Sequence, residues 1–101
     1  MVPAHLLGPK GGDHYVLRVV GDSMVEESIC DGDYVVVLRR ERAHPGEMVV
    51  VLVGDEVTLK RWYPEGDHVR LQPANAAMRP VRVPLADVRV QGIVVGLMRK
   101  F

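Results

Sequence analysis

Valine is the residue that most constrains how this chain can fold. Twenty of the 101 residues are valine, and most of them stand in short clusters. β-Branched side chains pack well on pleated surfaces and are stiff in helices, so the clusters predict strands. Glycine, proline and aspartate separate the clusters about every eight to twelve residues, a spacing typical of all-β sandwiches and barrels. The sequence therefore predicts an all-β fold.

Each cluster and the turn that ends it give the bounds of one expected strand. Strands are expected at His14–Val20, Tyr34–Arg39, Met48–Val53, Glu56–Tyr63, Val69–Gln72, Val81–Pro84 and Val88–Leu97. A short helical turn is expected at Ser23–Ser28, and Pro64–Asp67 is expected to be a turn. Because Tyr34–Arg39 is apolar on both faces over most of its length, we expect it to lie inside the sheet.

The first thirteen residues differ in composition from the rest of the chain. Residues 1–13 hold two prolines and three glycines and are expected to form an extended arm or linker. Residues 14–101 then make one domain, because a chain of this size can build one modest core but not two. No apolar run approaches the ~20 residues of a membrane-spanning helix, and no export signal is visible at the N-terminus.

Charge and cysteine content limit the possible functions. Basic and acidic residues number 13 each, so the net charge of zero argues against membrane binding and against nucleic-acid binding by this domain alone. The single cysteine, Cys30, cannot form an internal disulfide, which favours a reducing cytoplasm. Neighbouring carboxylates disfavour a thiolate, so Cys30 is expected to be a small, partly buried residue. No histidine or cysteine pair has metal-ligand spacing, and no metal or other cofactor is predicted.

Ser23 is the first candidate for chemistry. It follows a turn that ends a strand, in the tetrapeptide Gly21–Met24, where its hydroxyl is accessible and nearby backbone N–H groups can converge as in an oxyanion hole. The same tetrapeptide is also ordinary turn chemistry. A serine nucleophile needs a base. No histidine falls in a pattern that resembles a triad, and all four are expected on the surface: His5, His14, His44 and His68.

Lys60 is the candidate base, since burial can lower the pKa of a lysine enough for it to accept a proton. It lies in the middle of an expected strand, and alternation puts Glu56, Thr58 and Trp62 on the same face. Thr58 could hydrogen-bond the amine. Alternatively, Lys60 lies on a solvated face and pairs with Glu56. The pattern alone leaves both interpretations open.

Six motifs in a fixed order carry a resemblance to a known family. They are Gly21–Met24, Ile29–Asp33, Pro45–Val50, Glu56–Arg61, Val69–Asn75 and Gln91–Gly96. Together they resemble the C-terminal domain of LexA-type repressors, a family that includes the SOS repressor, phage repressors and the polymerase accessory protein UmuD. Signal peptidases are more distantly related. The likeness runs from about Tyr15 to Arg99, and the 37-residue separation of Ser23 and Lys60 also fits.

The resemblance implies a fold of short, highly twisted antiparallel strands and a Ser–Lys peptidase domain over residues 14–101. It implies that Ser23 is the nucleophile and that Lys60, neutral and buried, is the general base. Backbone N–H groups of Asp22 and Ser23 would hold the oxyanion, Thr58 would orient Lys60, and Glu56 would tune its charge. In the family, a peptide loop docks over the lysine, promoted by a RecA filament as co-protease, and self-cleavage derepresses DNA-damage genes.

The sequence also departs from the family. Family members cut themselves at an Ala-Gly or Cys-Gly bond before the serine, and neither dipeptide occurs here. The 22 residues before Ser23 are too few for that loop, and a helix-turn-helix DNA-binding domain is missing. We therefore expect that this chain does not cut itself. It would be a piece of a longer repressor, a standalone relative acting in trans, or a non-catalytic dimerisation module.

The last expected strand bears on self-association. Val90–Leu97 is strongly apolar and near the C-terminus, so it is either an edge strand that pairs with a symmetry mate or an internal core strand. The pattern does not decide between them. The resemblance favours a homodimer formed through this C-terminal strand region.

Overall fold

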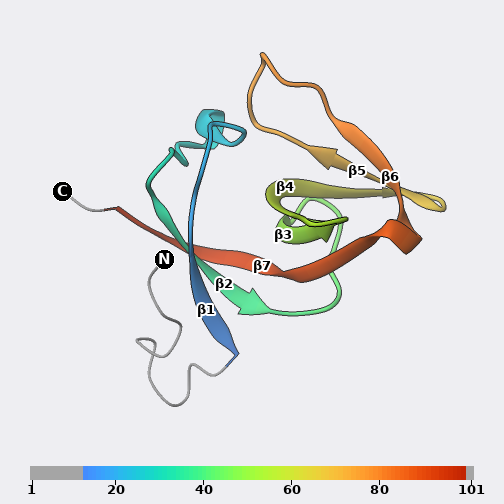
Figure 1. Cartoon of the computed structure of the whole chain (residues 1–101), viewed down its shortest axis with the longest axis horizontal. Helices are drawn as coiled ribbons and strands as arrows, with labels where there is room; N and C mark the ends of the chain where they lie inside the picture. The colour runs from blue at the N-terminus through green and yellow to red at the C-terminus, as the bar shows by residue number, and fades with distance from the viewer. Residues whose placement is uncertain (1–12, 100–101) are drawn as a thin grey trace.

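Seven β-strands make up most of residues 13–99, the part of the chain that the computed structural model describes (Figure 1). Their bounds are β1 (His14–Arg18), β2 (Tyr34–Arg39), β3 (Met48–Val53), β4 (Glu56–Glu65), β5 (His68–Gln72), β6 (Val81–Pro84) and β7 (Val88–Met98). Two single 3₁₀ turns, η3 (Val25–Glu27) and η4 (Leu85–Asp87), are the helical elements within this range. The expected all-β fold of antiparallel strands is confirmed. The expected arm lies outside the described residues, apart from Asp13.

One antiparallel sheet holds all seven strands in the order β1-β2-β7-β3-β4-β5-β6. The middle position belongs to β3, whose first four residues are buried. β2 pairs with β1 on one side and with β7 on the other, so the prediction that Tyr34–Arg39 lies inside the sheet is confirmed. No helix in the described range is long and apolar enough to cross a membrane.

The expected turn at Pro64–Asp67 is partly wrong, because β4 continues to Glu65. The β3–β4 ladder ends at the Met48–Arg61 pair, and beyond it β4 is paired only with β5. A proline has no N–H to donate and is tolerated where one side of a strand is open. Pro64 therefore extends the strand, and the turn to β5 begins only at Gly66.

Apolar residues on both faces of the sheet form two core clusters. β3 alternates between them: Val49 and Val51 belong to the cluster around Trp62, whereas Met48 and Val50 belong to the other. The second cluster also contains Met24, only 1% exposed, and Ile29. The segment between β1 and β2 is thus anchored in the core on both sides of η3.

β7 is partly internal and partly open-edged. Its residues Val88–Ile93 pair with β3 and its residues Gly92–Met98 pair with β2, so the two ladders overlap only at Gly92 and Ile93. From Val94 to Met98, β7 pairs only with β2 within the described residues. Figure 1 shows this end of β7 running out beyond β3 towards the C-terminus. β7 is therefore an internal strand by its place between β2 and β3, and it has an open edge on the β3 side from Val94 onward.

Candidate active site

Ser23 and Lys60 line the same cleft. The cleft has a volume of about 520 Å³ and lies between the end of β1 with the turn after it, the first half of β4, and Met78. Thr58 and Glu56 line it as well. Asp22 is the fifth predicted site residue that lines it, so the fold brings together candidates that are far apart in the sequence.

The serine is carried to the cleft by a tight turn. Gly21 adopts a φ of +92°, a backbone conformation that side chains other than glycine rarely take. The buried side chain of Met24 fixes the chain directly after the serine. Ser23 Oγ donates a 3.5 Å hydrogen bond to the carbonyl oxygen of Leu59, the residue before Lys60. This bond is long and weak, so the hydroxyl rests against the lysine-bearing strand and is free to reorient.

Lys60 is half-buried and points along the same face of β4 as Thr58. Its Nζ donates a 2.5 Å hydrogen bond to Thr58 Oγ1. Burial lowers the pKa of Lys60, and the charge of Glu56 opposes this by raising it. Lys60 forms no salt bridge with a carboxylate anywhere between residues 13 and 99. The Lys60 amine therefore loses its proton more readily than the amine of an exposed lysine or of a lysine in an ion pair.

Backbone N–H groups around the serine are available as donors. Within the described range, those of Asp22 and Ser23 have no protein acceptor. The carbonyl groups of the same two residues are engaged, since Asp22 O accepts from Asn75 Nδ2 at 2.9 Å and Ser23 O accepts from the Ala74 N–H at 2.7 Å. Unpaired N–H groups beside a nucleophile are what an oxyanion hole requires.

The histidines play no part in this cleft. His14, His44 and His68 do not line it, and His5 lies outside the described residues. Cys30 is exposed, so the expectation of a partly buried side chain is wrong. Its backbone N–H donates to Asp33 Oδ2 at 2.8 Å in the turn before β2, which leaves the thiol facing outward. Among residues 13–99, no group of three or more histidines, cysteines or carboxylates could hold a metal ion.

Comparison with known proteins bears on the family of this chain. The model of the family described as Peptidase S24-like matches residues 1–95. This chain belongs to that family. The expected resemblance is thereby confirmed, and the cleft described above is the hollow of an S24-like domain that contains a serine and a lysine.

Relatives of this S24-like domain are LexA repressors. That of Myxococcus xanthus is 50% identical over 96 residues, which cover 92% of this chain and 43% of the relative. That of Koribacter versatilis is 56% identical over 88 residues, which cover 86% of this chain and 42% of the relative. That of Syntrophotalea carbinolica is 45% identical over 101 residues, which cover 99% of this chain and 49% of the relative. The chain therefore spans less than half the length of these relatives.

Two features of the S24-like site were not found from the sequence. Arg61, on the face of β4 opposite Lys60, makes a bidentate ion pair with Glu27 of η3. Its Nη1 also donates a hydrogen bond to Gly46 O at 2.9 Å. Asn75, in the loop between β5 and β6, contacts the turn that carries the serine. Asn75 ends one of the six motifs. No local rule, however, connects it to a residue more than fifty positions away.

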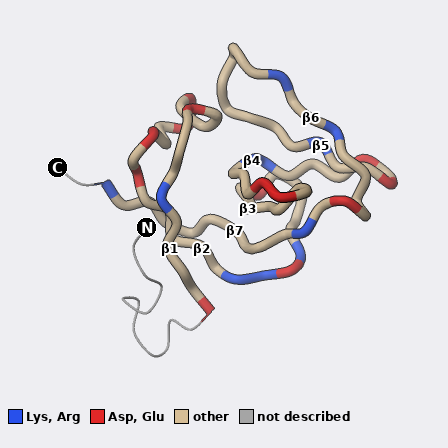
Figure 2. Tube along the Cα trace, in the orientation of Figure 1, with Lys and Arg blue, Asp and Glu red and all other residues tan. Residues whose placement is uncertain are grey.

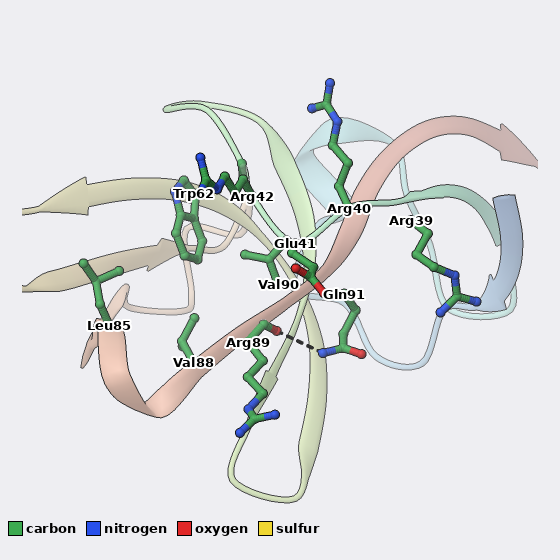
Figure 3. Close-up of a pocket in the computed structure, with 11 residues that line it drawn as sticks. Arg39, Arg40, Glu41, Arg42, Trp62, Leu85, Val88, Arg89, Val90 and Gln91 are labelled. Carbon is green, nitrogen blue, oxygen red and sulfur yellow. Dashed lines mark hydrogen bonds between the residues drawn. The ribbon is translucent and has the colours of Figure 1, made fainter. Parts of the chain in front are cut away.

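A larger hollow of about 720 Å³ lies elsewhere on this S24-like domain (Figure 3). It is lined by four arginines and by Trp62, and none of its lining residues in the described range is a serine, threonine, cysteine, histidine or lysine. Figure 3 shows the guanidinium groups of Arg40 and Arg89 pointing in opposite directions. Figure 2 shows basic residues gathered in the loop after β2 and acidic residues on the segment around η3. Within the described residues, the larger hollow thus offers charge but no candidate nucleophile, whereas the smaller cleft holds Ser23 and Lys60.

Proposed function

We propose that this chain is the C-terminal peptidase and dimerisation domain of a LexA-like SOS repressor, and that Ser23 and Lys60 cut a peptide bond. The observation that carries the proposal is a half-buried lysine that pairs with no carboxylate of residues 13–99 and lies in one cleft with an accessible serine. The S24-like family match and the LexA repressor relatives support it.

The reaction runs as acyl transfer. Neutral Lys60 Nζ takes the proton of Ser23 Oγ as the oxygen bonds to the substrate carbonyl carbon. The Asp22 and Ser23 N–H groups hold the oxyanion. The C–N bond then breaks, and the Lys60 ammonium gives its proton to the leaving nitrogen. A water molecule, deprotonated by Lys60 in the same way, hydrolyses the resulting ester and frees Ser23.

The charge state of Lys60 controls the rate of this scheme. A lysine with a pKa near ~10.4 is neutral in only roughly four molecules in ten thousand at about pH 7. Burial lowers the pKa of Lys60 and so increases the neutral fraction, while Glu56 limits the effect. Thr58 accepts a hydrogen bond from Nζ and orients the amine. A substrate loop that covers the cleft would remove more water and lower the pKa further.

In the parent protein, the substrate would be the repressor's own cleavage loop, and a RecA filament would promote its docking. Cutting that loop would derepress DNA-damage genes. We assign the domain to the cytoplasm on its LexA repressor relatives and its single cysteine. The domain itself would not contact DNA. A standalone protein that acts on a separate chain in trans would use the same chemistry.

A cleavage assay in trans tests the proposal. The substrate is a separate peptide with an Ala-Gly loop, incubated with the unmodified protein, Ser23→Ala or Lys60→Ala at alkaline pH. We expect the two variants to lose at least about 10³-fold in rate, since nucleophile and base act as one unit. His44→Ala, an exposed histidine away from the cleft, is the control and should keep the full rate. An unmodified protein no faster than Ser23→Ala would refute the peptidase.

A dimerisation module is the second candidate function, and one observation favours it. Val95, Leu97 and Met98 are 52%, 42% and 40% exposed on the half of β7 that has an open edge. An open edge with apolar side chains is a template for pairing with another chain. Two copies related by a two-fold axis could join these edges antiparallel. This homodimer is compatible with the peptidase and does not depend on it.

A further inference from the structure

The peptide group before Ser23 is held by a side chain from a distant loop. Asn75 Nδ2 donates to the carbonyl oxygen of Asp22 at 2.9 Å, and Asn75 Oδ1 accepts from the N–H of Ala77 at 2.9 Å. Both ends of the amide are engaged, so its orientation is fixed by its own loop. Asn75 therefore presents an NH₂ group to the Asp22 carbonyl in a defined direction.

This contact determines where the Ser23 N–H points. In a planar trans peptide, the C=O and the N–H of the same group point in opposite directions. The Asp22 carbonyl and the Ser23 N–H belong to one such group. Holding the carbonyl towards Asn75 turns the N–H away from it. Ser23 lines the cleft, and its N–H has no acceptor in the described part of the chain.

The other bonds between the two segments act on different groups. Ala74 N–H donates to Ser23 O at 2.7 Å, and Glu26 N–H donates to Ala74 O at 2.8 Å. The carboxylate of Glu26 accepts from the Ala76 N–H at 2.5 Å. The Val25 N–H also reaches Asp22 O, but at 3.4 Å. Asn75 thus makes the shorter of the two hydrogen bonds to the Asp22 carbonyl. The Glu26 side chain binds the loop that carries Asn75 but makes no hydrogen bond to that carbonyl.

We propose that Asn75 is a positioning residue of the oxyanion hole, which aims the Ser23 N–H by holding the Asp22 carbonyl. The inference rests on the proposed peptidase function. An oxyanion forms only during the reaction, so a misdirected donor slows turnover without weakening substrate binding. Asn75 itself does not touch the substrate.

Three variants test this role in the trans assay with the Ala-Gly loop peptide. Asn75→Asp keeps an oxygen for the Ala77 N–H but cannot donate to Asp22, and Asn75→Ala loses both bonds. Glu26→Ala is the matched control, because it removes the other side-chain bond between the same segments. We expect both Asn75 variants to lose about 10- to 100-fold in kcat with KM changed less than about twofold. Glu26→Ala should keep kcat within about threefold.

The pH–rate profile and melting temperature separate positioning from damage to the fold. The rate is compared on the alkaline plateau, where Lys60 is fully neutral in every variant. Equal losses of kcat in Asn75→Ala and Glu26→Ala would overturn the inference, since loop docking alone would then explain them. So would an Asn75→Asp variant with the unmodified kcat. An unmodified protein no faster than Ser23→Ala would instead refute the peptidase, and this inference with it.

Discussion

At the scale of single residues, the central feature is the amine of Lys60 and the groups that set its charge. Burial on β4 lowers its pKa, and this is the larger effect. Glu56, an exposed carboxylate four residues earlier on the same face, raises the pKa. Thr58 holds the amine by a hydrogen bond to its hydroxyl oxygen. The neutral fraction of Lys60 therefore reflects two opposed influences, one of which can be removed by a single substitution.

Glu56→Gln should move the pH dependence of cleavage to lower pH. The substitution removes the charge that raises the Lys60 pKa, so neutral lysine is reached with less alkali. The measurement is the midpoint of the rising limb of kcat against pH in the trans assay. Glu41→Gln, a carboxylate at the larger hollow, is the control and should leave the midpoint in place. A midpoint unchanged or raised in Glu56→Gln would contradict this role.

At the scale of elements, the segment between β1 and β2 is held by two arginines that lie outside it. Arg61 of β4 holds Glu27 of η3. Arg99, just after β7, donates to both carboxylate oxygens of Asp33, at 2.9 and 2.7 Å, and to Ser28 O at 2.6 Å. These bonds, together with the buried Met24, fix the segment that presents Ser23 to the cleft. The site is thus positioned by long-range contacts rather than by one rigid element.

Asp33 should make stability depend on pH at the acid end. The hydrogen bonds from Arg99 and from the Cys30 N–H lower its pKa from 3.8 to about 2. A lowered carboxyl pKa gives stability that is present above about pH 4 and lost as the pH falls through about 2. Asp33→Asn should therefore unfold at a lower denaturant concentration than the unmodified protein near neutrality, and the difference should shrink between pH 4 and pH 2. A difference that stays constant over that range would contradict this account.

Local sequence patterns predicted the strands but not which strands pair with one another in the sheet. Valine clusters and turns gave β2, β3 and β6 with the observed bounds, since strand propensity is a local property. The insertion of β7 between β2 and β3 has no local signal, because pairing order depends on contacts across the whole chain. Local patterns alone also left open whether Lys60 is solvated, and the family resemblance singled it out.

The supporting contacts of the site could not be predicted for a related reason. Arg61–Glu27 and Asn75–Asp22 each join side chains and backbone from segments far apart in the sequence. Their residue types are ordinary for surface strands and loops. Cys30 was misjudged because composition favours burial of a small apolar residue, whereas the turn before β2 points its thiol outward.

At the scale of the whole molecule, the sheet has places where a second copy could add. β1 and β6 are its outer strands, and the last half of β7 has an open edge of its own. The β7 edge carries three exposed large apolar side chains within four positions, whereas β6 carries one, Val81. Among these edges, β7 is therefore the one on which we expect self-association.

Leu97→Arg should dissociate the dimer. Leu97 is 42% exposed on the open half of β7, and a charge there would be desolvated by pairing. The matched control is Val81→Arg, since Val81 is 53% exposed on β6 at the other end of the sheet. Sedimentation equilibrium at about 10 µM should find a dimer for the unmodified protein and Val81→Arg, and a monomer for Leu97→Arg. A monomeric unmodified protein, or a Leu97→Arg variant that remains a dimer, would contradict the assignment.

The most direct measurement is the titration of the Lys60 Nζ by heteronuclear NMR, with Lys60→Arg to assign the signal among only three lysines. Partial desolvation beside Ser23 predicts a midpoint clearly below the ordinary lysine value of 10.5. It also predicts a further fall when Glu56 is replaced by glutamine. A Lys60 that titrates at or above the ordinary value would mean that no base stands ready for the serine.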